Sequence, residues 1–255
     1  MKRKTALSFF LLGLALAGLA LMVYLATKDC GSGTKNPEKQ IAMPAEYELQ
    51  GLKGPVKNTS YEYEEQKLLV QNLRPGDRVL QLGGNIGTSC ITAAMAEPGL
   101  ESNVCVEPNT NLASIIEANV SQLGVAAGVQ ILPKMVTKAN CSVMRLKGTD
   151  SHQGNAGYIE EGGEGLPVEC TSLADVMKEK NKGAKFTVLF ADCEGCLPGF
   201  VEENAELLDE LRVLIYEHDR GSEVDYSPVK KLTKRMNCKG DFNVVCTLKK
   251  KFSKR

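Results

Sequence analysis

Residues 74–87, RPGDRVLQLGGNIG, combine a turn, a short apolar strand and a glycine loop that opens a helix. Such a loop brings bare backbone close to a bound ligand. Dinucleotide-binding folds use G-x-G-x-x-G at this place to hold a pyrophosphate, but here Asn85 takes the third position and the spacing is Gly83-x-x-x-Gly87. The stretch therefore favours a cofactor without a phosphate group.

A carboxylate follows the next strand along the chain. Glu107, in the sequence Glu107-Pro108-Asn109, stands twenty residues after Gly87 and directly after the apolar run 103–106. At the carboxyl end of a parallel strand, this side chain would accept hydrogen bonds from both hydroxyls of a ribose. S-adenosylmethionine has a ribose and no phosphate, so we expect it to be the cofactor.

Short apolar runs alternate with helix-like stretches over most of the chain. The expected strands are 78–82, 103–106, 129–132, 186–190, 212–216 and 242–248, and the expected helices are 87–96, 110–123 and 199–211. Strand followed by helix, repeated, is typical of a doubly wound, mostly parallel α/β sheet in one domain, here residues 58–255. Residues 137–172 break this pattern with Gly-rich sequence, which we interpret as a hairpin with a loop.

Four sequence blocks, taken in order, resemble the FkbM-type S-adenosylmethionine-dependent methyltransferases. The blocks are P-G-D…G-x-N-x-G at 75–87, E-P-N at 107–109 with Asn119 downstream, T-S-L at 171–173 with Asp175, and D-C-E-G at 192–195; a weaker match is the strand ending in Glu217. The resemblance implies a class I methyltransferase fold with a seven-stranded sheet. The cofactor-binding residues that it implies are Gln81, Gly83, Asn85, Gly87, Glu107 and Asn109.

The same resemblance implies an acceptor site near Asp192 and Glu194. A sulfonium methyl group is already activated, so the protein mainly has to align an acceptor with it and exclude water. When the acceptor is a hydroxyl, its proton must leave, and the candidate bases are Glu194, which we favour, Asp192 and His218. We predict no metal site.

Three positions depart from the family pattern. Gln81 stands where the family usually has an acidic residue, and Phe190 and Leu197 replace a Lys and a Glu that it often has on the acceptor side. A catalytically degenerate binding protein of the same fold is therefore one alternative. A thiol redox module is another, because Cys193 and Cys196 form a C-x-x-C pair after an apolar strand.

The amino end carries the pattern of a membrane anchor. Basic residues at 2–4 precede an uncharged run from 6 to 26, which is long enough to cross a hydrocarbon core of about 30 Å. The positive-inside bias keeps residues 1–5 in the cytoplasm. We predict a single-pass type II membrane protein with a stalk at 27–57 and its folded domain in the lumen of the secretory pathway, in the ER or Golgi.

Three sequons, at Asn58, Asn119 and Asn140, and nine cysteines fit such a disulfide-permissive compartment. The odd number of cysteines predicts a free thiol or a bond between chains, with Cys30 as the candidate for a disulfide-linked dimer; buried reduced cysteines are the alternative. Thirty-one basic and thirty-one acidic residues cancel, which argues against a nucleic acid partner. A lumenal site favours a glycan or another small molecule as acceptor.

Overall fold

The computed structural model describes residues 42–138, 144–147, 158–161, 164–219 and 224–249. The predicted anchor at 6–26, Cys30 and the sequon at Asn140 lie outside these ranges. Within the ranges, no helix combines the length and the apolar character that crossing a membrane requires.

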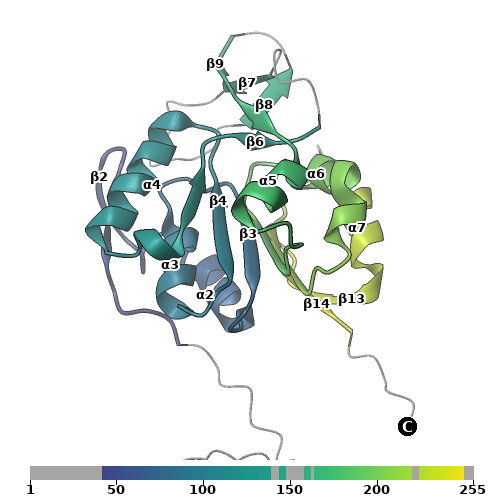
Figure 1. The fold of residues 1–255 in the computed structure, drawn as a ribbon, viewed down its shortest axis with the longest axis horizontal. Helices are drawn as coiled ribbons and strands as arrows, with labels where there is room; N and C mark the ends of the chain where they lie inside the picture. Colours follow the sequence, from purple (N-terminus) through teal and green to yellow (C-terminus); the bar gives the residue numbers. More distant parts are fainter. Residues whose placement is uncertain (1–41, 139–143, 148–157, 162–163, 220–223, 250–255) are drawn as a thin grey trace, which may run out of the picture. The chain divides into compact units, whose positions relative to one another are not determined.

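Seven strands form the central sheet, in the order β13-β14-β12-β11-β3-β4-β5 (Figure 1). Neighbours from β12 to β5 run parallel, while β14 is antiparallel to both β12 and β13. The strands are β3 (Arg78–Leu82), β4 (Ser102–Val106), β5 (Gln130–Leu132), β11 (Val188–Ala191), β12 (Val213–Glu217), β13 (Met236–Lys239) and β14 (Asn243–Leu248). The predicted doubly wound, mostly parallel sheet is confirmed, and β13 is a strand that the apolar pattern did not indicate.

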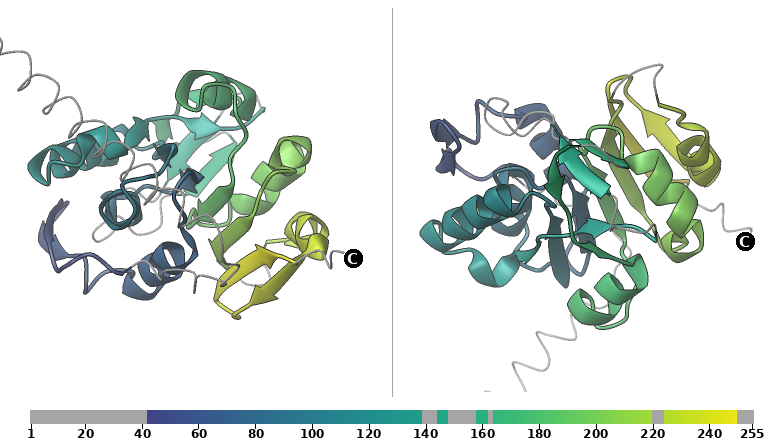
Figure 2. Two further views of the ribbon diagram at one scale, coloured as in Figure 1. Left: turned by 60° about the horizontal axis from the view of Figure 1, so that its bottom comes forward. Right: turned by 90° about the horizontal axis from the view of Figure 1, so that it is seen from above.

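Helices cover both faces of this sheet (Figure 1 and, in two further views, Figure 2). The helices of one face are α2 (Tyr63–Asn72), α3 (Thr88–Ala96) and α4 (Thr110–Gln122), and those of the other are α5 (Leu173–Lys180), α6 (Leu197–Asn204) and α7 (Ser227–Leu232). Successive side chains of β3 pack against opposite faces of the sheet. Val79 shares a core cluster with Leu69 of α2, whereas Leu80 shares one with Leu173 of α5. A strand buried on both sides needs a continuous apolar sequence, which explains the run in β3.

The chain joins the fold before the predicted boundary at residue 58. β1 (Glu48–Gly51) pairs antiparallel with β2 (Gly54–Lys57), and Leu49 and Val56 are buried in a core cluster shared with α3 and α4. The predicted stalk at 27–57 is therefore wrong in its last part. Its apolar residues are single and separated by Gly, Lys and Glu, so no sustained period marked them as a strand pair.

The Gly-rich segment between β5 and α5 forms a small sheet of its own. β7 (Met144–Lys147) pairs antiparallel with β8 (Tyr158–Glu161) and with β9 (Leu166–Pro167). This confirms the predicted hairpin within 137–172. A short parallel pair, β6 (Met135–Val136) with β10 (Cys170–Thr171), joins the two ends of the segment.

Two of the three sequon asparagines are buried. Asn58 accepts a hydrogen bond from the Tyr47 N–H through Oδ1 at 2.9 Å, and Asn119 exchanges hydrogen bonds of 2.7 and 3.0 Å with the backbone of Gln50. A glycan at either position would displace these contacts. In the folded domain Asn58 and Asn119 are therefore not glycan acceptors, and they no longer support a lumenal location.

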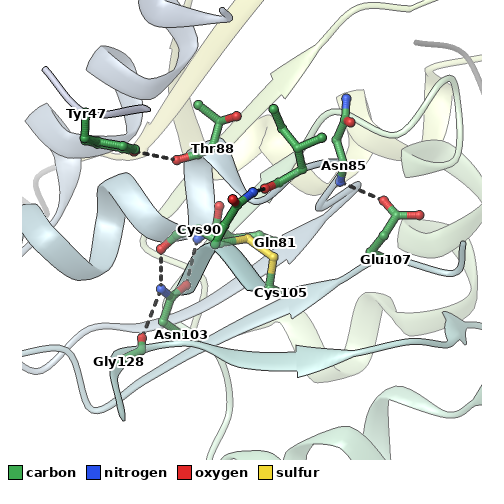
Figure 3. Close-up of a disulfide and its surroundings, with 11 residues drawn as sticks. Tyr47, Gln81, Asn85, Thr88, Cys90, Asn103, Cys105, Glu107 and Gly128 are labelled. Atoms are coloured by element: carbon green, nitrogen blue, oxygen red, sulfur yellow. Dashed lines mark hydrogen bonds between the residues drawn. A yellow bond between two sulfur atoms is a disulfide. The ribbon is translucent and has the colours of Figure 1, made fainter. Parts of the chain in front are cut away.

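Disulfides join most of the described cysteines. The pairs are Cys90–Cys105, Cys193–Cys196 and Cys238–Cys246, and Cys170 is disulfide-bonded as well. The first pair links α3 to β4 and is fully buried (Figure 3). For these residues the structure agrees with the expected disulfides and not with the alternative of reduced, buried thiols.

Candidate active site

The glycine loop packs against the carboxyl end of the neighbouring strand β11. Gly83 has a φ of +85°, and a β-carbon there would lie 1.7 Å from the carbonyl oxygen of Asp192. The N–H groups of Gly83 and Gly84 both donate to the Val106 carbonyl, at 3.1 and 2.8 Å. Only glycine fits at position 83, so backbone packing fixes the loop between β11 and β4.

Glu107 is held at the end of β4 by two backbone donors. Its Oε2 accepts from the Asn85 N–H at 2.7 Å (Figure 3). Its Oε1 accepts from the Asn109 N–H at 2.8 Å. The side chain is 7% exposed. Burial raises the pKa of Glu107 to about 7, while the two N–H donors lower it. Each oxygen has a second lone pair, so the carboxylate keeps acceptor capacity for a ligand.

Asn85 and Gly87 complete the loop in left-handed backbone conformations, with φ of 51° and 93°. The Asn85 Nδ2 donates to the Tyr61 hydroxyl at 2.6 Å, whereas its Oδ1 is buried and has no hydrogen-bond partner. A β-carbon on Gly87 would lie 3.0 Å from Ile116 Cγ2 of α4. The loop therefore carries one unsatisfied acceptor, on Asn85, beside the Glu107 carboxylate.

Asn109 has a structural role that the sequence pattern did not separate from cofactor binding. It is the N-cap of α4, and its Oδ1 accepts from the N–H groups of Asn111 at 3.0 Å and Leu112 at 3.5 Å. Its own N–H is the donor that holds Glu107. Asn109 thus positions both the helix and the carboxylate.

Gln81 lies in the packed layer between the sheet and α3. It is fully buried, and its Nε2 donates to Asn103 Oδ1 at 2.7 Å. The Asn103 amide in turn donates to the carbonyls of Cys90 at 2.9 Å and Gly128 at 3.2 Å (Figure 3). This network accounts for the Gln81 amide nitrogen without a ligand, while the Gln81 Oε1 is a buried acceptor without a partner.

Carboxylates gather at the ends of β11 and β12. Two trios, Glu62 with Glu65 and Asp192, and Asp192 with Glu217 and Asp219, each bring one oxygen per residue within 4.8 Å of the others. Asp192 was a predicted site residue and the other four were not named as such. Glu62 and Glu65 belong to the start of α2, more than a hundred residues earlier in the sequence, so only the tertiary fold reveals their proximity. We call these five residues the acidic cluster.

Burial raises the pKa values of Glu62, Glu65, Asp192 and Asp219. The pKa is raised to about 7 for Glu62 and Asp219 and to about 8 for Glu65, first by burial and further by neighbouring carboxylates. For Asp192, burial and then the charges of Glu62 and Glu65 hold the pKa well above its usual range. These four groups therefore hold a proton more strongly than exposed carboxyl groups do.

The other two predicted bases flank the acidic cluster. Glu194 has a left-handed φ of 55°, and the N–H of the following residue, Gly195, donates to Asp219 Oδ2 at 3.0 Å. The His218 ring packs against Tyr226, with ring centroids 4.1 Å apart, and its backbone N–H donates to the Phe242 carbonyl at 2.8 Å. The fold thus brings both to the carboxyl edge of the sheet beside Asp192.

Cys193 and Cys196, the basis of the redox alternative, form a disulfide at the start of α6. Strand, C-x-x-C and helix follow one another as that alternative requires. They do so inside a seven-stranded sheet, however, with the glycine loop on the adjacent strand β3. A thioredoxin-like module explains neither the sheet nor the loop.

Comparisons with known proteins show similarity of fold alone. No family model matches the chain, and no curated protein matches it. One similar solved structure is Sp1610 of Streptococcus pneumoniae, a proposed tRNA (m1A22) methyltransferase in complex with S-adenosyl-L-methionine. The two chains are 12% identical, the match covers 73% of this chain and 72% of that chain, and the TM-score is 0.44. An O-methyltransferase from Bacillus cereus in complex with SAH has 16% identity, coverage of 76% and 82%, and a TM-score of 0.42. Precorrin-6y C5,15-methyltransferase from Geobacter metallireducens has 10% identity, coverage of 74% and 88%, and a TM-score of 0.44.

Such similarities leave the function to be inferred from the geometry of this chain. The chain has a Rossmann-like sheet, as the order and direction of its seven strands show. Of the predicted cofactor residues, Gln81 lies within the packed core, and the other five converge at the carboxyl edge of this sheet, where open α/β folds bind their ligands.

Proposed function

We propose that this protein is an S-adenosylmethionine-dependent methyltransferase of the FkbM type that acts on a hydroxyl group. The observation that carries the proposal is the Glu107 carboxylate, fixed by the N–H groups of Asn85 and Asn109 at the end of β4. It stands beside a loop that only glycine can form at position 83. This combination suits a cofactor with a ribose and no phosphate.

The residues of the loop fit S-adenosylmethionine. Glu107 would accept the ribose hydroxyls with the lone pairs that its two backbone donors leave free. The buried, unpartnered Oδ1 of Asn85 offers a further acceptor to a cofactor amine or hydroxyl. Gly83 is partly exposed beside the Glu107 carboxylate, whereas Gly84 and Gly87 are buried and let the loop pack closely against β4 and α4. Gln81 contributes less than predicted, because its amide nitrogen is committed to Asn103.

The acceptor would lie at the adjacent end of β11. When bound, the cofactor supplies an activated methyl group, so the protein has to orient a nucleophile and receive its proton. The close approach of Gly83 to the Asp192 backbone places the end of β11 directly beside the loop. Glu194 or Asp192 would take the proton of the hydroxyl, with His218 as the third candidate.

We further propose that the domain is membrane-anchored by residues 6–26 in a type II orientation, in the secretory pathway, and that it acts on a glycan or another small acceptor. Its disulfides support this location, because such bonds persist in oxidising compartments. Cys30 would link two copies through a disulfide. No nucleic acid partner is proposed.

Calorimetric titration of S-adenosylmethionine into the full-length chain tests the cofactor assignment. We expect saturable binding by the wild type and a loss of about tenfold or more in Glu107→Ala, equivalent to roughly 1.4 kcal/mol. The matched control is Glu117→Ala, because Glu117 is an exposed carboxylate on the neighbouring α4. Unchanged affinity in Glu107→Ala would contradict the assignment.

The same titration separates the enzyme from the alternative of a catalytically degenerate binding protein with this fold. Phe190 and Leu197 are both buried core residues, so these departures from the family pattern serve packing. A folded wild-type chain that binds no S-adenosylmethionine would favour the degenerate protein over the enzyme. Binding without methyl transfer to any hydroxyl acceptor would favour a binding protein that kept its cofactor site.

A further inference from the structure

The acidic cluster is more than the proposed methyl transfer requires. A single carboxylate is enough to receive a proton, whereas five converge here from three elements: the start of α2, the end of β11 and the end of β12. Asp192 belongs to both trios and so joins them into one group. Two of the five, Glu65 and Asp219, are at least nine-tenths buried.

No basic side chain among the described residues neutralises this group. The ion pairs described for the chain involve other carboxylates, which are those of Glu46, Glu64, Asp77, Glu101, Glu169, Asp209 and Glu210. Carboxylates that are removed from water without a counter-charge destabilise the folded protein. Among the residues that the structure describes, therefore, none of these ion pairs joins the cluster to a basic side chain.

A second observation points into the cluster. Glu65 is 7% exposed, and its Oε2 is buried without any hydrogen-bond partner. Glu65 forms one of the two trios with Glu62 and Asp192. The nearby Asn243 interacts with the Glu65 side chain, and its own Oδ1 is also buried without a partner. Buried acceptors without donors are rare in folded proteins, and a bound cation satisfies several of them at once.

We propose that the acidic cluster binds a hard divalent cation of the Ca²⁺, Mg²⁺ or Mn²⁺ class. Oxygen is the only donor type that the five residues offer, which favours these ions over zinc or copper, for which nitrogen and sulfur ligands are preferred. Glu62, Glu65 and Asp192 form one side of the site, and Glu217 and Asp219 the other. The cation binds at the acceptor end of the sheet, yet the inference does not rest on methyl transfer, because cation binding is measured without cofactor or acceptor.

Titration of the full-length chain with CaCl₂, and separately with MnCl₂, tests the proposal. In calorimetry we expect saturable binding by the wild type, and at least about tenfold weaker binding in Glu65→Gln and in Asp192→Asn, because affinity follows the number of charged ligands. The matched control is Asp209→Asn, whose exposed carboxylate pairs with Lys185 outside the cluster and whose binding should equal that of the wild type.

Thermal unfolding separates loss of the site from loss of the fold. Ca²⁺ should raise the Tm of the wild type and leave that of Glu65→Gln unchanged, since a ligand stabilises only a protein that binds it. Without the cation, Glu65→Gln should melt no lower than the wild type, because a neutral amide of nearly the same shape replaces a buried carboxyl group that lies among other carboxyl groups. Absence of saturable binding to folded wild type would overturn the proposal, as would wild-type affinity in both cluster variants.

Discussion

Glu107 and the acidic cluster stand at the same edge of one sheet and differ in how their charges are satisfied. Both oxygens of Glu107 accept backbone N–H groups supplied by the loop and by the start of α4. In the cluster, Glu65 keeps a buried oxygen without a partner, and its neighbours are further carboxylates. The chain completes the first site with its own backbone, whereas the second is the one for which we propose a bound cation.

Where the residues come from explains this difference. Glu107, Asn85 and Asn109 follow two adjacent parallel strands, so short local connections bring N–H donors to the carboxylate. The cluster joins the ends of β11 and β12 to α2, and its side chains come from distant parts of the chain. The Gly195 N–H donates to Asp219 there, whereas the Glu65 Oε2 has no hydrogen-bond partner. Substitutions in the glycine loop should therefore lower the stability of the fold, whereas substitutions in the acidic cluster should weaken ligand binding.

The largest effect is expected from Gly83→Ala. The added β-carbon would overlap the Asp192 carbonyl oxygen, 1.7 Å away, in a backbone conformation with φ of +85°. We expect a loss of at least about 3 kcal/mol in the free energy of unfolding, measured by urea denaturation. The control Gly124→Ala, at φ +69° with open space around it, should cost only about 1 kcal/mol. Equal costs at the two positions would contradict the packing described for the loop.

Glu107→Gln should change how stability depends on pH. The pKa of Glu107 is raised from 4.5 to about 7, first by burial, so the folded state holds a proton that the unfolded state loses. The proton on Glu107 contributes its full stabilisation below about pH 4.5, and this contribution is lost as the pH rises through 7. Between these values the wild type should lose about 3 kcal/mol more than the variant. Parallel stability curves from denaturation at several pH values would refute this.

A smaller effect is expected from Asn109→Ala, which removes the cap of α4 and keeps the backbone N–H that holds Glu107. The expected cost is about 1 kcal/mol in the free energy of unfolding, again by denaturation. Asn111→Ala, an exposed change in the first turn of the same helix, is the control and should be nearly neutral. A larger loss from the control than from the cap change would contradict the assignment.

Local patterns predicted the sheet well. β3 has the bounds expected from the sequence, because Val79, Leu80 and Leu82 form a mostly apolar run that is buried on both faces of the sheet. β13 was missed, since only Met236 of its four residues is buried and Lys239 and Cys238 face solvent. The start of the fold was placed too late for a similar reason: Leu49 and Val56 are isolated apolar residues whose burial depends on α3 and α4.

The candidate site could be predicted only where its residues follow strands directly. Glu107, Asn85 and Asp192 lie at strand ends, and the topology of a parallel sheet brings such positions to one edge. Glu65 gave no signal, because it lies in the first turn of α2, far from the other cluster residues in the sequence. The acidic cluster is built from residues far apart in the sequence, so no short-range motif indicated it. The family resemblance also implied a cofactor role for Gln81, whose amide nitrogen donates a hydrogen bond to Asn103.

The most direct test of these two sites is a crossed titration of S-adenosylmethionine and Ca²⁺ into the wild type, Glu107→Ala and Glu65→Gln. We predict that Glu107→Ala loses affinity for the cofactor by about tenfold or more and binds Ca²⁺ as the wild type does, and that Glu65→Gln shows the reverse. If both variants lost both ligands, or if neither lost its own, the division of this edge into a cofactor site and a cation site would be wrong.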